Sequence, residues 1–295
     1  MGNTFLSLAL LIISHFFTAT FSMKSTTIFT DQSALLTLKC YVLRDPENLL
    51  STNWSASTPV CSWFGISCGS KHRRVTVINL HGLGHIGTLP PYIGNLTFLA
   101  LISVENNNFH GQLPVQLSDL RPLKRIRFGD LSKLESLSLF DNQISGRIPS
   151  SLFKCKELQF LSVSSNHLEG SLAVEIGNLS MLQVLYIGQN QFEEQIGNLK
   201  RVEWLNLGPN NFVGPIPPSI FNSSTLSSVS FAVNQLSGHL PPTMGLWLPN
   251  LEEIYLGKND LVGPFRSRSP MPLSSFLSTC HIISCPDPFL KLLAI

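Results

Sequence analysis

A phrase near the middle of the chain limits the possible fold more strongly than any other part of the sequence. Residues 134–149 read LESLSLFDNQISGRIP. The alternation of leucine and serine over residues 137–139 suits a short strand with one buried face. The amide of Asn142 can satisfy backbone groups where the chain leaves that strand, Gly146 permits a bend, and Pro149 cannot return to a hydrogen-bonded ladder. The phrase therefore predicts a strand followed by a turn.

The phrase recurs along most of the chain, which is typical of leucine-rich repeats. Its first apolar position returns at intervals of 24, 11, 24, 24, 20, 24 and 25 residues, and a weaker copy with Leu83 in place of the asparagine precedes them. Because each repeat buries its apolar side against its neighbours, the sequence predicts an α/β leucine-rich-repeat solenoid with a parallel β-sheet on its concave face. The first apolar positions are Leu99, Leu123, Leu134, Leu158, Leu182, Val202, Leu226 and Leu251, and the asparagines are Asn107, Asn142, Asn166, Asn190, Asn210, Asn234 and Asn259.

Two intervals depart from the usual spacing. Neighbouring parallel strands need a crossover of about a dozen residues or more, so the copies 11 residues apart at Leu123 and Leu134 cannot both occupy adjacent places. We expect residues 99–134 to act as one repeat of 35 residues, with the strand at 101–104 paired directly with the strand at 136–139. The interval of 20 residues before Val202 shortens the turn near Gln195.

The N-terminus predicts export from the cell. Residues 1–22 contain no charged side chain and include an apolar run over residues 5–17, which together indicate a secretory signal peptide, although no basic residue precedes the run. No other stretch approaches 18 uninterrupted apolar residues, so no membrane span is expected. A formal net charge of +2 argues for neither nucleic acid nor a membrane surface as a partner. We expect the protein to be secreted to the apoplast or held at the extracellular face of the plasma membrane.

Export makes the cysteines interpretable, because disulfides persist in oxidising compartments. Cys61 and Cys68 stand just ahead of the first repeat. We expect them to form a disulfide in a small cap that covers the exposed apolar end of the solenoid. Cys40 and Cys155 have no partner nearby in the sequence and are predicted to be buried as small apolar residues.

Residues 30–53 are predicted to form a helical N-terminal cap. Thr30 or Asp31 can cap a first helix, and a second helical turn is expected at residues 47–50, after Pro46. The expected apolar face of the first helix consists of Ala34, Leu35, Leu38 and Val42.

Phrases within this cap and the repeats resemble a known family. DQSALLTLK at residues 31–39, CSWFGISC at 61–68 and RVTVINL at 74–80 resemble the N-terminal cap of plant leucine-rich-repeat receptor kinases. The phrase IGNL, which occurs at residues 93–96, 176–179 and 196–199, is similar to the repeats of the same plant type. The resemblance covers roughly residues 30–265, and the branch that it resembles includes pattern-recognition immune receptors.

The resemblance implies a non-catalytic, extracellular ligand-binding domain of a receptor-like protein or kinase with a role in immune perception. Its partners would be an extracellular peptide or protein ligand and a co-receptor. The family continues into a membrane helix and a kinase domain, whereas this sequence contains no glycine-rich phosphate loop, VAIK, HRD or DFG motif and cannot be a kinase. We expect it to be a truncated ectodomain that needs no cofactor or metal.

The sequence divides into a signal peptide (1–22), a disulfide-tied cap (23–74), the repeats (75–265) and a divergent tail (266–295) that is expected to be disordered. Two alternatives remain open. A soluble apoplastic inhibitor of cell-wall-degrading enzymes, similar to polygalacturonase-inhibiting proteins, would close its solenoid with a cysteine-tied cap, for which Cys280 and Cys285 are candidates. A non-functional truncated gene product is the other alternative.

The candidate ligand-binding residues are aromatic side chains on the concave face. In each repeat the third, fifth, seventh and eighth residues are expected to point from the strands towards that face. Exposed aromatic residues bury much area on binding at a small entropic cost, although strand propensity alone also favours them there. The candidates are Phe140, Phe160, Tyr186, Trp204 and Tyr255, with Asp141, Asn206, Glu253 and Lys258 as polar neighbours.

Other signals concern modification and catalysis. The sequons at Asn53, Asn95, Asn178 and Asn222 predict glycosylation in an exported protein, with Asn95 and Asn178 on the same lateral or convex side. Residues 82–87 match the dinucleotide fingerprint GxGxxG, but the prolines that follow leave no room for the helix that the fingerprint requires. We find no catalytic constellation in the sequence.

Overall fold

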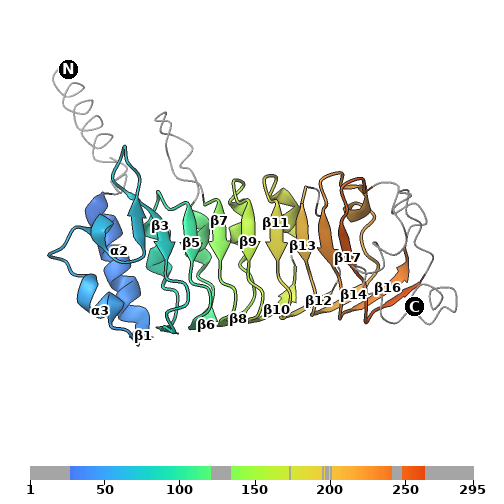
Figure 1. Ribbon diagram of the computed structural model, residues 1–295, viewed down its shortest axis with the longest axis horizontal. Helices are drawn as coiled ribbons and strands as arrows, with labels where there is room; N and C mark the ends of the chain where they lie inside the picture. The colour runs from blue at the N-terminus through green and yellow to red at the C-terminus, as the bar shows by residue number, and fades with distance from the viewer. Residues whose placement is uncertain are drawn as a thin grey trace, which may run out of the picture.

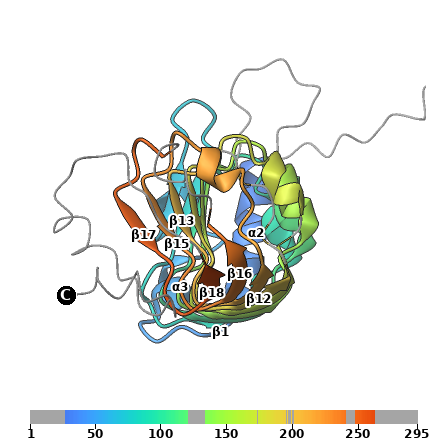
Figure 2. The same cartoon turned by 90° about the vertical axis from the view of Figure 1, so that its right-hand side faces the viewer.

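The computed structural model describes residues 27–120, 134–172, 174–194, 196, 199, 201–240 and 248–262. These residues form an elongated solenoid with a helical cap at its N-terminal end (Figure 1). Viewed along its axis, the coil has three sides, formed by two β-sheets and a column of short 3-10 helices (Figure 2). The predicted leucine-rich-repeat solenoid is therefore confirmed.

The first sheet is the predicted stack of parallel strands. Its order is β17-β15-β13-β11-β9-β7-β5-β3-β2, and every neighbouring pair except β2 with β3 is parallel. The strands are β2 (Ile66–Cys68), β3 (Val75–Asn79), β5 (Leu101–Ser103), β7 (Ser136–Ser138), β9 (Phe160–Ser162), β11 (Val184–Tyr186), β13 (Trp204–Asn206), β15 (Ser228–Ser230) and β17 (Glu253–Tyr255).

The expected long repeat is also confirmed. Strand β5 pairs directly with β7, with Leu101 opposite Ser136 and Ser103 opposite Ser138. The repeat that contributes the next strand of the first sheet begins at Leu134. The side chain of Leu134 is 1% exposed. The copy that begins at Leu123 falls within residues 121–133, outside the described residues, so its expected displacement is not tested.

A second sheet, which the sequence analysis did not anticipate, runs alongside the first. It forms where each chain segment continues past the asparagine, and its order is β1-β4-β6-β8-β10-β12-β14-β16-β18. Only the pair of β1 with β4 is antiparallel among the pairs of this sheet. The strands are β1 (Val42–Arg44), β4 (Ile86–Gly87), β6 (Asn108–Gln112), β8 (Gln143–Gly146), β10 (His167–Ser171), β12 (Gln191–Glu194), β14 (Asn211–Gly214), β16 (Gln235–His239) and β18 (Asp260–Val262).

The third side carries one 3-10 helix in most of the described repeats. Apolar side chains from these helices close the core against the leucines of the strands; Leu117, Leu152 and Ile176 are each at most 2% exposed. The helices are η2 (Pro91–Asn95), η3 (Val115–Asp119), η4 (Ser150–Lys154), η5 (Val174–Asn178) and η6 (Ile220–Asn222).

The repeated asparagines connect the two sheets. In Asn166, for example, the amide nitrogen donates to the carbonyls of Leu139 and Val163 at 2.9 and 3.1 Å. Its oxygen accepts the backbone N–H of Ile144 from the preceding repeat at 2.9 Å. These bonds satisfy buried backbone groups at the corner between the sheets, where no strand partner can reach them. The same arrangement recurs at Asn107, Asn142, Asn190, Asn210, Asn234 and Asn259.

The cap begins earlier than expected. Helix α2 (Ile28–Tyr41) has Thr27, not Thr30 or Asp31, at its N-cap, and Thr30 instead accepts the Thr27 backbone N–H through Oγ1 at 3.1 Å. Asp31 is fully buried in the first turn, where it binds Arg74. Ala34, Leu35 and Leu38 form the buried face as predicted, whereas Val42 lies in β1.

The second cap helix is also shifted from the expected position. Helix α3 (Leu49–Asn53) starts two residues after the predicted turn began. Asp45 explains the shift, because its carboxylate accepts the backbone N–H groups of Leu49 and Ser51 at 3.1 and 2.8 Å, at the start of the helix.

The disulfide is present as expected, while one of the two remaining cysteine predictions is wrong. Cys61 and Cys68 are bonded, with their Cα atoms 5.5 Å apart. Cys155 is buried as predicted, whereas Cys40 is exposed. Cys40 is exposed because it lies on the side of α2 opposite Leu35 and Leu38, which face the core.

Candidate ligand-binding surface

The first sheet presents a row of outward side chains on every strand. In β13, Trp204 and Asn206 point away from the core, and Leu205 between them is buried. The same alternation places Tyr186 in β11 and Tyr255 in β17 on the outer surface. The motif leucines therefore fix which side chains a ligand can reach.

None of the five predicted aromatic residues is buried. Phe140 is 38% exposed and Trp204 is 41% exposed, while Phe160, Tyr186 and Tyr255 are half-buried. The rings of Phe160 and Tyr186 meet edge to face, with centroids 6.2 Å apart. We call the five residues the aromatic strip.

Strand register decides which members of the strip lie close together. Phe160, Val184 and Trp204 are in register on three successive strands, and Tyr186 lies one row further along beside Asn206. Tyr255 lies two strands beyond Asn206 in the same row. Strands β9 to β13 therefore hold the densest part of the strip, with Phe140 and Tyr255 on either side.

A carboxylate adjoins this part of the strip. Trp204, Ser228 and Glu253 are in register on β13, β15 and β17, so the small side chain of Ser228 separates the indole from the carboxylate. The Ser228 hydroxyl donates to Glu253 Oε2 at 3.1 Å and orients it. The pKa of Tyr186 is raised above its ordinary value by burial and by the negative charge of Glu253. The surface over Ser228 is therefore both aromatic and negatively charged.

Just beyond the strands, two glycines allow neighbouring repeats to approach closely, a feature that the sequence pattern was not used to predict. A Cβ atom on Gly188 would collide with the carbonyl oxygen of Gly208, and a Cβ atom on Gly208 would collide with that of Ala232. The corresponding position of an earlier repeat holds Phe140. The glycines at this motif position were the available signal in the sequence.

The other predicted polar neighbours lie at the edges of this surface. Asp141 and Lys258 occupy the same position of two distant repeats, and both have left-handed backbones with φ of 55° and 58°. Asn206 accepts the backbone N–H of Gly208 through Oδ1 at 3.1 Å. Of the four, Glu253 and Asn206 are therefore placed beside the densest part of the strip, and Asp141 and Lys258 are not.

The predicted glycosylation sites lie away from the first sheet. Asn95 and Asn178 end the 3-10 helices η2 and η5, on the third side of the coil (Figure 2). Asn53 ends α3 in the cap, and Asn222 ends η6. Glycans at these asparagines would leave the aromatic strip accessible.

The GxGxxG phrase has a structural explanation. Gly82 and Gly84 take left-handed conformations with φ of 71° and 64°, and strand β4 follows them. The next helix is η2, a 3-10 helix that begins at Pro91. This segment is a repeat turn and does not open a helix towards a phosphate.

Comparisons with known proteins agree with this architecture. Residues 30–69 match the leucine rich repeat N-terminal domain, and residues 133–155 and 157–179 match the leucine rich repeat. The LRR ectodomain of the plant membrane receptor kinase GASSHO1/SCHENGEN3 from Arabidopsis thaliana, solved in complex with Casparian strip integrity factor 2, covers 86% of this chain with 30% identity and a TM-score of 0.71. The chain is a leucine-rich-repeat protein that is similar to the ectodomains of plant receptors.

Two further relatives belong to the same plant receptor type. The Arabidopsis receptor kinase HAESA, solved with the peptide hormone IDA and the co-receptor SERK1, covers 80% of this chain with 25% identity and a TM-score of 0.60. Receptor-like protein 41 from Arabidopsis thaliana is 37% identical over 177 residues, which is 58% of this chain. The chain spans only 19% of that relative, 29% of the GASSHO1/SCHENGEN3 chain and 43% of the HAESA chain. Within the part of the chain that the structure describes, no helix is long and apolar enough to cross a membrane.

Proposed function

We propose that this protein is an extracellular ligand-binding domain that captures a peptide on its first sheet. We further propose that this capture has a role in immune perception. The observation that carries the proposal is the aromatic strip, whose five rings remain at least partly exposed along one face. Exposed aromatic residues bury a large area on binding and cluster at the centres of interfaces. The mechanism is binding without chemistry, and signalling is left to a co-receptor.

The surface over Ser228 indicates which side chain the peptide supplies. Neighbouring strands lie about 4.8 Å apart, so Trp204 and Glu253 flank a gap of two strand spacings. A lysine or arginine in that gap would meet the face of the indole and the carboxylate together. The negative charge of Glu253 contributes to the raised pKa of Tyr186, so this charge also acts on the neighbouring part of the surface. The preferred ligand is therefore a peptide with a basic residue.

The test uses the secreted protein and a phage library of random linear peptides. Peptides selected on the wild type should carry a lysine or arginine and should lose at least tenfold in affinity for the variant with Tyr186→Ala and Trp204→Ala. Glu253→Gln should weaken peptides with a basic residue and leave neutral peptides unchanged. Melting temperatures should hardly change, because these side chains lie outside the core.

The matched control is Tyr92→Ala, which removes an aromatic ring that is 53% exposed on η2, away from the strip. It should leave capture unchanged. Equal capture by the wild type and the double variant would refute the aromatic strip as the binding surface. Selective inhibition of a polygalacturonase by the wild type would instead support the enzyme-inhibitor alternative.

A further inference from the structure

A pocket lies beside the shortened repeat. Between Asn190 and Ile196 the chain advances 6 residues, whereas the equivalent step from Asn166 to Ile176 takes 10. The missing stretch includes the counterpart of Leu172, which is 3% exposed in the preceding repeat. An aliphatic side chain is thus absent from one layer of the core wall.

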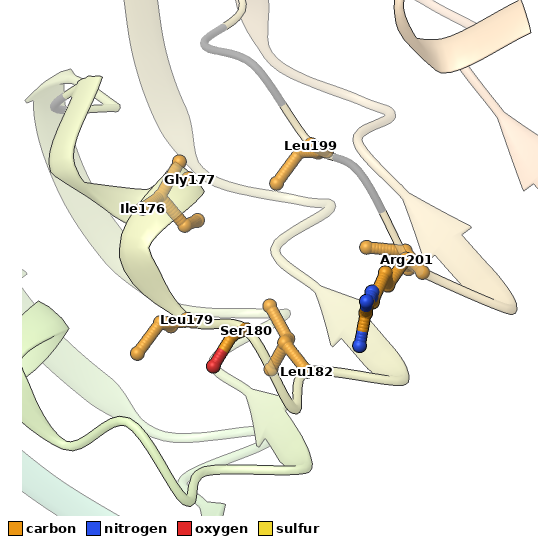
Figure 3. Close-up of a pocket in the computed structure, with 8 residues that line it drawn as sticks. Ile176, Gly177, Leu179, Ser180, Leu182, Leu199 and Arg201 are labelled. Carbon is orange, nitrogen blue, oxygen red and sulfur yellow. The ribbon is translucent and has the colours of Figure 1, made fainter. Parts of the chain in front are cut away.

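The cavity that adjoins this repeat has a volume of about 290 Å³. It lies between η5 and the segments that lead into β11 and β13, with Leu199 and Arg201 opposite Ile176 and Leu182 (Figure 3). This volume is close to the lower limit of about 300 Å³ for pockets that hold small molecules. The cavity is therefore large enough for a small ligand and too small for a folded segment.

Among the described residues, the lining of the cavity is aliphatic with a single cationic group. Ile176, Leu179, Leu182, Leu199 and Val202 provide apolar walls, and Arg201 provides a guanidinium at the exposed side. No carboxylate is among the described residues that line the cavity, and none of them forms an ion pair with Arg201. An arginine beside an apolar cavity whose described lining carries no carboxylate is complementary to a molecule with an anionic head and an aliphatic body.

We propose that this pocket binds a medium-chain aliphatic carboxylate. The hydrocarbon chain lies against the leucines, and the carboxylate accepts hydrogen bonds from Arg201. The site is separate from the aromatic strip, because η5 belongs to the third side of the coil and the strip belongs to the first sheet (Figure 2). Binding of the carboxylate to the pocket should therefore persist in the variant with Tyr186→Ala and Trp204→Ala.

The probe is sodium octanoate, titrated into the secreted, glycosylated protein by calorimetry. Because each buried methylene contributes a factor of about four in affinity, the series from butanoate to octanoate should tighten by about that factor per carbon. Arg201→Gln should weaken octanoate roughly tenfold and leave 1-octanol, which has no charge, unaffected.

A variant that fills the pocket provides the second measurement. Ser180 lines the cavity and is exposed, so Ser180→Met can enter the space without disturbing the core and should abolish octanoate binding. Ser180 also belongs to the sequon of Asn178, and Asn178→Gln therefore serves as the matched control that removes the sequon alone. Asn178→Gln should bind octanoate as the wild type does.

Three results would overturn the proposal. The first is no saturable binding of octanoate by the wild type. The second is equal affinity of the wild type and Arg201→Gln for octanoate. The third is unchanged binding after Ser180→Met. Loss of peptide capture on the first sheet would leave this site unaffected, so the two proposals fail independently.

Discussion

Asn142 donates its side-chain amide to the carbonyl oxygen of Val104 at 2.9 Å, although 38 residues separate them in the chain. Its Oδ1 atom accepts the backbone N–H of Phe109 at 2.9 Å, so one side chain holds both strands of the preceding repeat. The extended repeat between them could shift its register without such an anchor. The asparagine therefore makes the irregular repeat compatible with the regular stack.

Asn142→Ala should lower the free energy of unfolding by about 2–4 kcal/mol, because it leaves the buried groups of Val104 and Phe109 without their partner. The urea midpoint would show the loss, and amide exchange at Phe109 should accelerate. Asn108→Ala is the control, since its exposed side chain makes a single bond to Gln143 at 3.2 Å. A similar effect of both variants would contradict this role for Asn142.

The buried pair of Asp31 and Arg74 should hold the cap on the solenoid. Arg74 donates to the carboxylate through Nε at 2.8 Å and Nη2 at 2.6 Å, and the backbone N–H of Val75 donates to it at 3.0 Å. Arg74→Met leaves the buried carboxylate without its cation and should cost about 3–5 kcal/mol, measured by thermal unfolding. Glu105→Gln alters the more exposed pair with His81 and should cost less than about 1 kcal/mol.

Glu194 occupies a position that suits glycine. Its φ is 66°, and the equivalent residues Gly146, Gly170 and Gly214 have φ of 76°, 80° and 75°. Because side chains disfavour this region by roughly 1–2 kcal/mol, Glu194→Gly should stabilise the protein by about 1 kcal/mol. The urea midpoint should rise with an unchanged slope.

Glu193→Gly separates the backbone effect from the loss of charge. Glu193 lies in the same strand and is also exposed, but its φ is not positive. Glycine in a strand interior costs roughly 0.5–1 kcal/mol, so this variant should be less stable than the wild type. Stabilisation by both substitutions would instead point to relief of charge repulsion.

The repeats could be predicted because the same residues recur at the same corner. Leucines that alternate with polar residues specify the first sheet. The minimum length of a crossover between parallel strands predicted that only one of the copies at Leu123 and Leu134 could provide the next strand, and the complete motif favoured Leu134. The second sheet was missed because its strands carry at most one buried side chain each, such as Phe109 or Leu168, which gives no alternation to detect. The pocket could not be predicted either, since a deletion of four residues does not reveal whether the neighbouring side chains close the gap.

In the first repeat, His85 occupies the position that the buried side chain of Phe109 fills in the next repeat. It is fully buried, and its backbone N–H binds Asn107 as that of Phe109 binds Asn142. Burial lowers the pKa of His85 below its ordinary value, although the charges of Asp45, whose Oδ1 lies 3.7 Å from Nδ1, and Glu47 oppose that shift. Burial raises the pKa of Asp45, but hydrogen bonds from Ser51 and Leu49 together with the charge of His85 keep that pKa below its ordinary value. The imidazole of His85 therefore takes up a proton less readily in the folded protein than in the unfolded chain.

The consequence is a loss of stability on acidification that His85→Phe should remove. The unfolded chain takes up a proton at His85 as the pH falls below about 6.5, whereas the folded chain takes it up only at a lower pH. The free energy of unfolding should therefore decrease from pH 7 towards pH 5, by at most about 1.4 kcal/mol per pH unit for this one group. Phenylalanine fits the same place in the repeats of Phe109, Phe192 and Phe212, so the variant should keep the fold and show a shallower dependence. Urea unfolding of both proteins at pH 5, 6 and 7 measures the difference, and parallel pH profiles would mean that His85 is protonated equally in the folded and unfolded states.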